Sequence, residues 1–194
     1  MQQVSDEEVM LNYQKGQVEA MDELLRRYKT PIYHFAFRLL GNAAEAQDIT
    51  QEAFLRVHQC KGTYQPSGKF STWIFSITHN LAVSRLRSKK MWALWPRQED
   101  DTDALVEFAS TDPSPEEIVS TNELSDVLKK CIQSLPFLQR EALVLREYQG
   151  LDYQEIAKIL NKSLGTVKTL IHRARQNLKD KLLPYAQELK KGGL

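Results

Sequence analysis

Apolar residues recur along most of this chain at the three- and four-residue spacing of an α-helix. No convincing stretch shows the two-residue alternation of a half-buried strand. The 194 residues, 42% of them hydrophobic, suffice for one or two small domains with a core. The sequence therefore predicts an all-α fold, with helices near 6–15, 17–40, 43–59, 71–90, 120–134, 136–148, 152–160 and 164–182.

The stretch from Trp95 to Pro115 interrupts this pattern with three prolines, many acidic residues and little periodicity. Residues 1–92 carry 12 Lys and Arg against 9 Asp and Glu, and residues 122–194 carry 13 against 8. Residues 93–121 carry one basic residue and eight acidic ones, so the net charge of +1 hides two basic blocks. We expect two small helical domains, 1–92 and 120–194, joined by a flexible acidic linker over 93–119.

The two cysteines, Cys60 and Cys131, lie far apart, and neither belongs to a Cys-x-x-Cys pair. The polar, acidic N-terminus does not resemble a signal peptide, and no apolar run approaches the ~18 residues of a membrane span. We therefore expect a cytoplasmic protein without membrane insertion. No metal site, cofactor or catalytic residue is expected.

The C-terminal block predicts a short helix near 152–160, a break at Asn161–Ser163 and a longer helix from 164. Asparagine tolerates the left-handed backbone of a tight turn, and serine is a favourable N-cap. The longer helix has an apolar stripe and, on another face, the basic residues Lys168, His172, Arg175 and Lys179, flanked by Thr169, Arg173 and Gln176. This layout is typical of a DNA-reading helix-turn-helix. A helical hairpin with a solvated basic face is the alternative.

In the N-terminal block, a Gly/Pro/Ser loop leads into a helix with aromatic residues at its start and basic residues at its end. The aromatic residues are Tyr64, Phe70, Trp73 and Phe75, and the basic ones are Arg85, Arg87, Lys89 and Lys90. Rings beside cations favour binding of a single strand, because unpaired bases stack on aromatic faces. The alternative is that the apolar residues belong to the core, and the helical spacing favours this for Phe70, Ile74, Ile77 and Leu81. The spacing does not decide between core and surface for Tyr64 and Trp73. It places Asn80, Ser84 and Arg87 on an exposed face.

The helix near 43–59 is amphipathic, with an inward face of Ala43, Ala46, Ile49, Ala53 and Val57. Its other side carries Glu45, Asp48, Gln51, Glu52 and Arg56. Spacing alone favours a solvated acidic face, whereas a basic protein partner would relieve the repulsion between Asp48 and Glu52.

Three segments in order resemble the motifs of bacterial extracytoplasmic-function (ECF, group 4) RNA polymerase sigma factors. Residues 44–57 resemble the helix with which these proteins bind the core polymerase, and residues 70–80 resemble their promoter-melting segment. Leu135-Pro136, Arg140-Glu141, residues 153–157 and 164–168, and Arg173-Ala174-Arg175 resemble their C-terminal promoter-reading domain. The chain departs from the family at Thr169-Leu170, where Ser-Arg is common, and has His172 at a base-reading position.

The resemblance implies a non-enzymatic specificity subunit that binds core RNA polymerase, recognises a promoter, melts its −10 element and starts transcription. The 43–59 helix would contact the clamp helices of the largest subunit through Asp48, Gln51, Glu52, Leu55 and Arg56. Contacts to the −10 element would come from Tyr64, Lys69, Phe70, Thr72, Trp73, Phe75, Asn80, Ser84, Arg85 and Arg87. Contacts to the −35 element would come from Tyr153, Ser163, Thr166, Lys168, Thr169, His172, Arg173 and Arg175.

The family resemblance further implies contact with the polymerase β flap, an acidic linker that threads the RNA exit path, and an anti-sigma factor as regulator. Two other classes remain as alternatives. A dimeric helix-turn-helix repressor or activator would share residues 151–175, although the N-terminal block offers no ligand-binding module. A metal-assisted nuclease would need His34, His58, Cys60, His79 or His172, of which only His58 and Cys60 are close in sequence.

Overall fold

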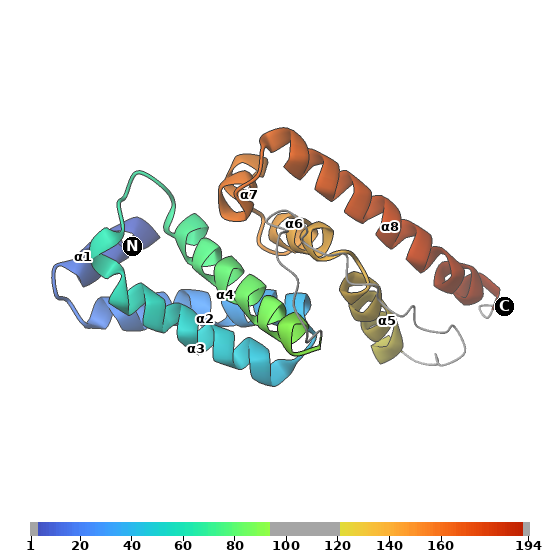
Figure 1. The fold of residues 1–194 in the computed structure, drawn as a ribbon, viewed down its shortest axis with the longest axis horizontal. Helices are drawn as coiled ribbons and strands as arrows, with labels where there is room; N and C mark the ends of the chain where they lie inside the picture. Colours follow the sequence, from blue (N-terminus) through green and yellow to red (C-terminus); the bar gives the residue numbers. More distant parts are fainter. Residues whose placement is uncertain (1–3, 94–120, 192–194) are drawn as a thin grey trace. The chain divides into compact units, whose positions relative to one another are not determined.

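The computed structural model describes residues 4–93 and 121–191, and all regular structure in those ranges is helical (Figure 1). The predicted all-α class is confirmed. The helices are α1 (Asp6–Gln14), α2 (Glu19–Leu40), α3 (Ala43–Gln59), the 3-10 helix η1 (Lys61–Thr63), α4 (Phe70–Ala93), α5 (Thr121–Gln133), α6 (Phe137–Glu147), α7 (Tyr153–Leu160) and α8 (Leu164–Lys191).

The described helices fall into two compact units. One contains α1, α2, α3 and α4 together with residues Gln154–Lys162, and the other contains α5, α6 and α8. The linker expected over 93–119 lies, from residue 94 onward, outside the described residues. The expected domain boundaries therefore stay predictions.

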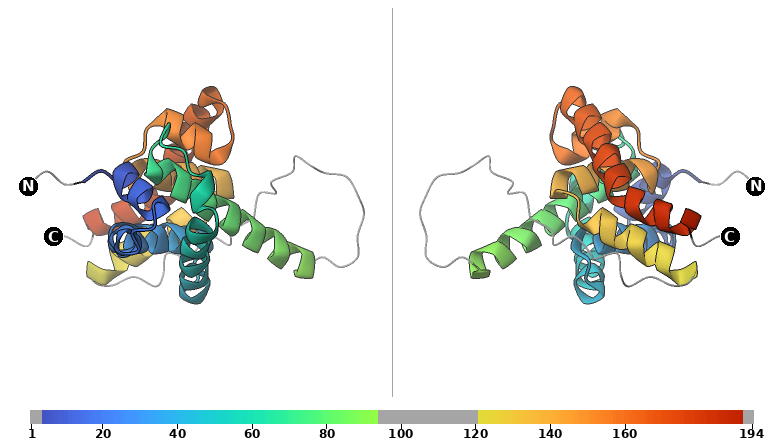
Figure 2. Two further views of the ribbon diagram at one scale, coloured as in Figure 1. Left: turned by 90° about the vertical axis from the view of Figure 1, so that its left-hand side faces the viewer. Right: turned by 90° about the vertical axis from the view of Figure 1, so that its right-hand side faces the viewer.

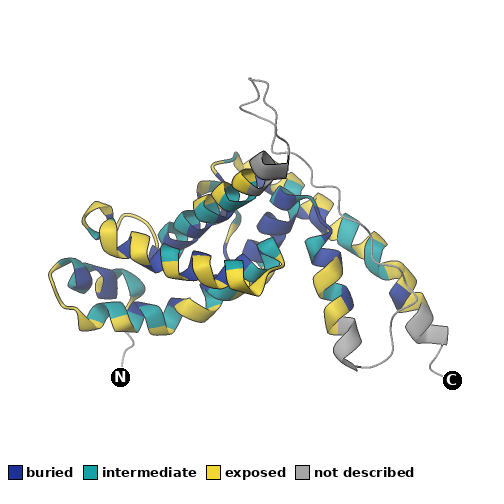
Figure 3. Cartoon of the chain, turned by 60° about the horizontal axis from the view of Figure 1, so that its bottom comes forward, coloured by how far each residue is buried: buried dark blue, intermediate teal, exposed yellow. Residues whose placement is uncertain are grey.

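In the first unit, α2 packs against α1, α3 and α4, and α3 also packs against α4 (Figures 1 and 2). Buried and exposed positions alternate around these helices with the helical period, as Figure 3 shows. The fully buried side chains Leu24, Ile32, Phe35, Phe70 and Ile74 form the centre of this core. The packing positions the exposed side of α3 and the first turns of α4, which carry the predicted contacts.

Local signals fix where these helices begin and end. The Ser5 hydroxyl accepts a hydrogen bond from the Glu8 amide (3.2 Å) at the start of α1. The Asn42 side chain likewise accepts one from the Glu45 amide (3.0 Å) at the start of α3. Between α2 and α3, Gly41 adopts a left-handed conformation (φ 69°), which a residue with a side chain rarely adopts. These local signals agree with the starts that the sequence predicts for α1 and α3.

The second unit is built around α8. Leu135, Leu143 and Ala174 form one buried cluster, and Val127, Cys131 and Tyr185 form another. The half-buried Leu178 packs against both. The periodicity predicts an end of this helix near 182, two residues before Pro184, but α8 continues through that proline to Lys191. Apolar packing of Tyr185 against α5 offsets the hydrogen bond that a proline removes from a helix.

Candidate nucleic-acid interface

The turn between α7 and α8 has the geometry that the sequence predicts. Asn161 adopts a left-handed conformation (φ 51°), and the Lys162 amide donates to the Ala157 carbonyl (3.0 Å). The Ser163 hydroxyl accepts a hydrogen bond from the Thr166 amide (3.1 Å), so Ser163 is the N-cap of α8. The cap therefore marks the start of α8 at the position that the sequence predicts.

The two faces of α8 separate as expected. Val167, Ile171 and Ala174 are buried, and Leu170 and Leu178 are half-buried. The polar positions are exposed: Ser163, Thr166, Lys168, Thr169, His172, Arg173, Arg175, Gln176 and Lys179. The exposed face thus presents several cations and hydrogen-bonding groups along one side of a rigid helix, which is what contact with DNA requires.

Two of the expected contact residues are engaged inside their own unit. Arg175 forms an ion pair with Glu147 of α6 (2.5 Å), and the hydrogen bond from Arg175 to this carboxylate raises the pKa of Arg175. Tyr153 is half-buried, and the guanidinium of Arg146 lies 5.1 Å from the centre of its ring. The exposed Arg173 has no such ion pair among the residues that the structure describes.

The aromatic residues at the start of α4 lie deeper than the single-strand interpretation expects. Tyr64, Phe70 and Phe75 are buried, and Phe75 packs edge-on against Phe35 of α2 with ring centres 5.2 Å apart. The core position that spacing favours for Phe70 is confirmed, and Tyr64, which spacing left open, also belongs to the core. An exposed ring at Phe75 is not what the structure has, because Phe75 fills the core of the first unit. Trp73 is half-buried and is the ring of this group that reaches the surface. It packs against Tyr64, with ring centres 5.2 Å apart.

The burial of Tyr64 has an electrostatic consequence. Removal from water, together with the nearby carboxylates of Glu7 and Asp6, raises the pKa of the Tyr64 phenol to about 12. The neutral hydroxyl donates to the Gly68 carbonyl at 3.3 Å. This hydrogen bond therefore links the buried Tyr64 side chain to the backbone of the loop before α4.

The polar residues expected to contact the −10 element lie mostly on the surface. Asn80, Ser84 and Arg87 of α4 are exposed, as the spacing predicted, and Lys69, before α4, is exposed as well. Thr72 and Arg85 are half-buried. The expected cations Lys89 and Lys90 lie outside the residues whose side chains the structure describes.

The outward face of α3 combines charge with an exposed apolar side chain. Ala46, Ile49, Ala53 and Val57 are buried as predicted, but Ala43 is exposed, because it is the first residue of the helix and lies outside the packed turns. Asp48, Gln51, Leu55 and Arg56 are exposed and Glu52 is half-buried. Leu55 keeps 48% of its surface exposed.

Two ion pairs link these side chains. Arg56 donates to Glu52 one turn earlier on α3 (2.8 Å), and Arg85 of α4 lies 3.7 Å from the Asp48 carboxylate. The second pair joins a residue expected to bind the polymerase to one expected to bind DNA. The two predicted surfaces of the first unit are therefore adjacent.

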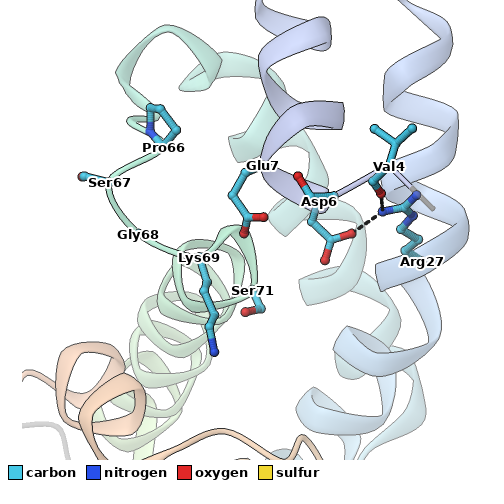
Figure 4. A pocket seen from close by; sticks show the side chains of 10 residues that line it. Val4, Asp6, Glu7, Arg27, Pro66, Ser67, Gly68, Lys69 and Ser71 are labelled. Atoms are coloured by element: carbon cyan, nitrogen blue, oxygen red, sulfur yellow. Dashed lines mark hydrogen bonds and ion pairs between the residues drawn. The ribbon is translucent and has the colours of Figure 1, made fainter. Parts of the chain in front are cut away.

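An open pocket of about 740 Å³ lies between the first turn of α1 and the loop that precedes α4 (Figure 4). Its lining includes Asp6, Glu7 and Arg27 on one side and Pro66–Lys69 on the other. The Glu7 carboxylate points toward the start of α4, where it accepts a hydrogen bond from the Phe70 amide (2.9 Å). This contact between α1 and the start of α4 has no local sequence signal, because it joins residues more than 60 positions apart.

The features expected of the metal-assisted nuclease do not come together in the described part of the chain. Within residues 4–93 and 121–191, no three His, Cys, Asp or Glu side chains form a group that could hold a metal ion. Among the helices in those same ranges, none has the length and apolar character needed to cross a lipid bilayer.

Comparison with known proteins assigns both parts of the chain. Residues 24–91 match the family model of sigma-70 region 2, and residues 125–178 match that of sigma-70 region 4. The chain is 37% identical to the ECF RNA polymerase sigma factor SigW of Bacillus subtilis, over 87% of this chain and 91% of that protein. It is 32% identical to the RNA polymerase sigma-H factor of Pseudomonas aeruginosa, over 96% of this chain and 98% of that protein.

A mycobacterial relative is longer. The chain is 39% identical to the ECF RNA polymerase sigma factor SigE of Mycolicibacterium smegmatis over 86% of its own length, but spans only 63% of that protein. Among solved structures, the sigma factor RpoE of Bartonella quintana, in complex with the anti-sigma factor NepR, has a TM-score of 0.66 at 22% identity, over 85% of this chain and 98% of that one. CnrH, in complex with the cytosolic domain of CnrY, has a TM-score of 0.64 at 18% identity, over 91% and 96%. These likenesses support the same fold.

Proposed function

Because this chain belongs to the ECF family of RNA polymerase sigma factors, we propose that it brings core polymerase to promoters through separate contacts of its two ends. Its function is promoter recognition at the start of transcription. In this proposal, residues 1–92 bind the polymerase and the −10 element, and residues 120–194 read the −35 element. The family models, at 24–91 and 125–178, fall within these two ranges. The acidic residues of 93–119 would follow the cationic path that nascent RNA takes.

The polymerase contact is assigned to the outward face of α3. Asp48, Gln51, Glu52, Leu55 and Arg56 would meet the clamp helices of the largest subunit. The exposed Leu55 supplies apolar area at the centre of this face, and the carboxylates of Asp48 and Glu52 would gain a basic partner. No chemical step is assigned to the chain, because recruitment and melting need binding energy alone.

The −10 contact is assigned to the loop before α4 and to the exposed side of α4. Lys69, Thr72, Trp73, Asn80, Ser84, Arg85 and Arg87 would touch the DNA. The buried rings of Tyr64, Phe70 and Phe75 would act indirectly, by holding the loop and Trp73 in place. A flipped base would be captured by the loop, at an unstacking cost of a few kcal/mol.

The −35 contact is assigned to α8, lying in a major groove. Lys168, Thr169, His172 and Arg173 would face base edges or phosphates, with Ser163, Thr166, Arg175 and Tyr153 at the margins. This unit would also contact the polymerase β flap. The single observation that carries the assignment is the exposed cationic face of α8 behind a capped three-residue turn.

The chain would work in the cytoplasm, where the polymerase is, and would be restrained by an anti-sigma protein. The support for such a partner is that the two solved structures of similar fold are described as complexes, one of them with an anti-sigma factor.

The test is run-off transcription with bacterial core polymerase on a library of genomic fragments, with and without the purified chain. The chain is expected to create new, defined start sites that share sequences near −35 and −10. Asp48→Asn should weaken association with core polymerase, whereas Asp22→Asn, an equal charge change at an exposed site on α2, should not. A chain that selects no start site would overturn the proposal, and a DNA-binding dimer that blocks transcription would favour a repressor.

A further inference from the structure

Helix α1 contacts both ends of the loop between α3 and α4, here called the α3–α4 loop (Cys60–Lys69). At the beginning of the loop, the Gln14 side-chain amide donates to the carbonyls of Lys61 (2.5 Å) and Tyr64 (3.0 Å). At its end, the Glu7 carboxylate accepts a hydrogen bond from the Phe70 amide (2.9 Å), the first residue of α4. The two anchors come from one helix.

The spacing of the two anchoring residues on α1 sets the distance between the two ends of the α3–α4 loop. Glu7 and Gln14 are seven residues apart, close to two helical turns, so they lie on the same face of α1 about 10 Å apart along its axis. A helix does not stretch, so the two ends of the loop are held at a fixed separation. Between the anchors, Gln65–Lys69 are exposed.

Helix α1 is in turn fixed on α2. Val9, Met10 and Tyr13 are buried, and the Asp6 carboxylate accepts hydrogen bonds from Arg27 (2.5 Å) and from the Tyr28 hydroxyl (2.5 Å). Figure 4 shows Asp6 directed toward Arg27 and Glu7 directed toward the start of α4. The neighbouring carboxylates therefore have different tasks: Asp6 holds α1 in place, and Glu7 holds the loop.

We propose that Glu7 and Gln14 are positioning residues for −10 recognition, which fix the shape of the α3–α4 loop without touching DNA. This inference rests on the proposed function, which assigns base capture to that loop. Both residues precede the part of the chain that matches the region 2 family model, residues 24–91. Base selectivity at −10 thus depends on a helix whose residues make no contact with the promoter.

Conservative variants separate the two hydrogen bonds from the bulk of the side chains. Glu7→Ala removes the acceptor, whereas Glu7→Gln keeps a carbonyl oxygen that the Phe70 amide can use. Gln14→Glu keeps the shape but removes the donor and turns a carboxylate oxygen toward two carbonyls. Glu8→Ala, at an exposed position of the same helical turn, is the matched control.

The experiment uses holoenzyme made from core polymerase and the full-length chain. The wild-type chain first selects a promoter from the fragment library, and every single-base variant of its −10 and −35 elements is then transcribed with each protein variant. Core binding and thermal stability are measured in parallel. We expect Glu7→Ala and Gln14→Glu to lower discrimination among −10 bases by roughly three- to tenfold, with −35 preference and core binding unchanged. Glu7→Gln should restore most of the discrimination, and Glu8→Ala should retain all of it.

The outcomes are distinguishable. If the wild-type chain selects no promoter, the proposed function itself fails. If it does select one, unchanged −10 discrimination in a folded Gln14→Glu or Glu7→Ala protein overturns this inference. An equal loss of −10 and −35 preference, or an equal loss in Glu8→Ala, would also overturn it, because the effect would then be general. Should Glu7→Ala not fold, Glu7→Gln and Gln14→Glu decide the matter.

Discussion

At the scale of single residues, one arginine joins the beginning of the chain to α2. The Arg27 guanidinium donates to the carboxylates of Glu23 (2.6 Å) and Asp6 (2.5 Å) and to the Val4 carbonyl (2.8 Å). Hydrogen bonds from Arg26 and Arg27 lower the pKa of Glu23 to about 2. The network therefore attaches α1 to α2 through charged groups, in addition to the buried apolar side chains of α1.

The low pKa of Glu23 predicts an acid-sensitive contribution to stability. A carboxyl with a lower pKa in the folded state stabilises that state above its unfolded pKa, and the contribution is lost as the pH falls toward 2. We expect Glu23→Gln to lower the free energy of unfolding at neutral pH and to flatten its decline in acid. Urea denaturation from neutral pH down to about 3 measures both effects. An equally steep decline in the variant would contradict the assignment, and Asp22→Asn on the same helix is the control.

Arg173 is the residue of α8 that best tests base reading, because it is exposed and outside the Arg175–Glu147 pair. If Arg173 reads a base, Arg173→Ala should weaken promoter binding by about 1–3 kcal/mol and relax the preference at one −35 position. Equilibrium binding of holoenzyme to promoters with single −35 changes measures this loss. An unchanged sequence preference would limit Arg173 to phosphate contact at most. Gln187→Ala, at an exposed position near the end of α8 and outside the predicted DNA-contacting residues, is the control.

At the scale of elements, side-chain caps mark the starts of α1, α3 and α8, and apolar packing accompanies the extension of α8. The starts of α1, α3 and α8 each have a serine or asparagine whose side chain accepts an amide hydrogen bond. The course of α8 through Pro184 follows from no capping residue, and it is accompanied by the packing of Tyr185 with Val127 and Cys131.

The cap of α8 therefore has a measurable effect. Ser163→Ala removes the acceptor of the Thr166 amide and should lower the free energy of unfolding by about 0.5–2 kcal/mol. Ser163→Asp, which keeps an acceptor, should retain most of the stability. Thermal unfolding followed by circular dichroism distinguishes the two. Equal stability of all three proteins would mean that the cap contributes nothing.

At the scale of the whole molecule, the two units are proposed to read separate stretches of one promoter. Contacts that do not share a partner should contribute independently. We expect the binding losses of Arg173→Ala on α8 and Asn80→Ala on α4 to add in the double variant, to within about 0.5 kcal/mol. A double-mutant cycle on holoenzyme–promoter affinity measures the coupling. A larger coupling would mean that the two contacts depend on one another.

Much of the candidate site could be predicted from residues close in sequence. The exposed positions Asn80, Ser84 and Arg87 and the two faces of α8 follow from a helical repeat that needs no knowledge of the fold. The rings of Tyr64 and Phe75 could not be placed in this way, because an aromatic residue near a basic segment suits a core as well as a binding surface. Their burial depends on α1 and α2, which lie far away in the sequence.

The amino-acid sequence by itself determined the helical class, the separate basic blocks, the capped turn before α8 and the polar face of α3, because each depends on interactions among residues within about one or two helical turns. Only the tertiary structure decided that the rings of Tyr64 and Phe75 are buried, that Asp48 lies beside Arg85, and that α1 holds both ends of the α3–α4 loop. Those contacts join residues 37 to 63 positions apart, and they form only when apolar burial brings the helices together.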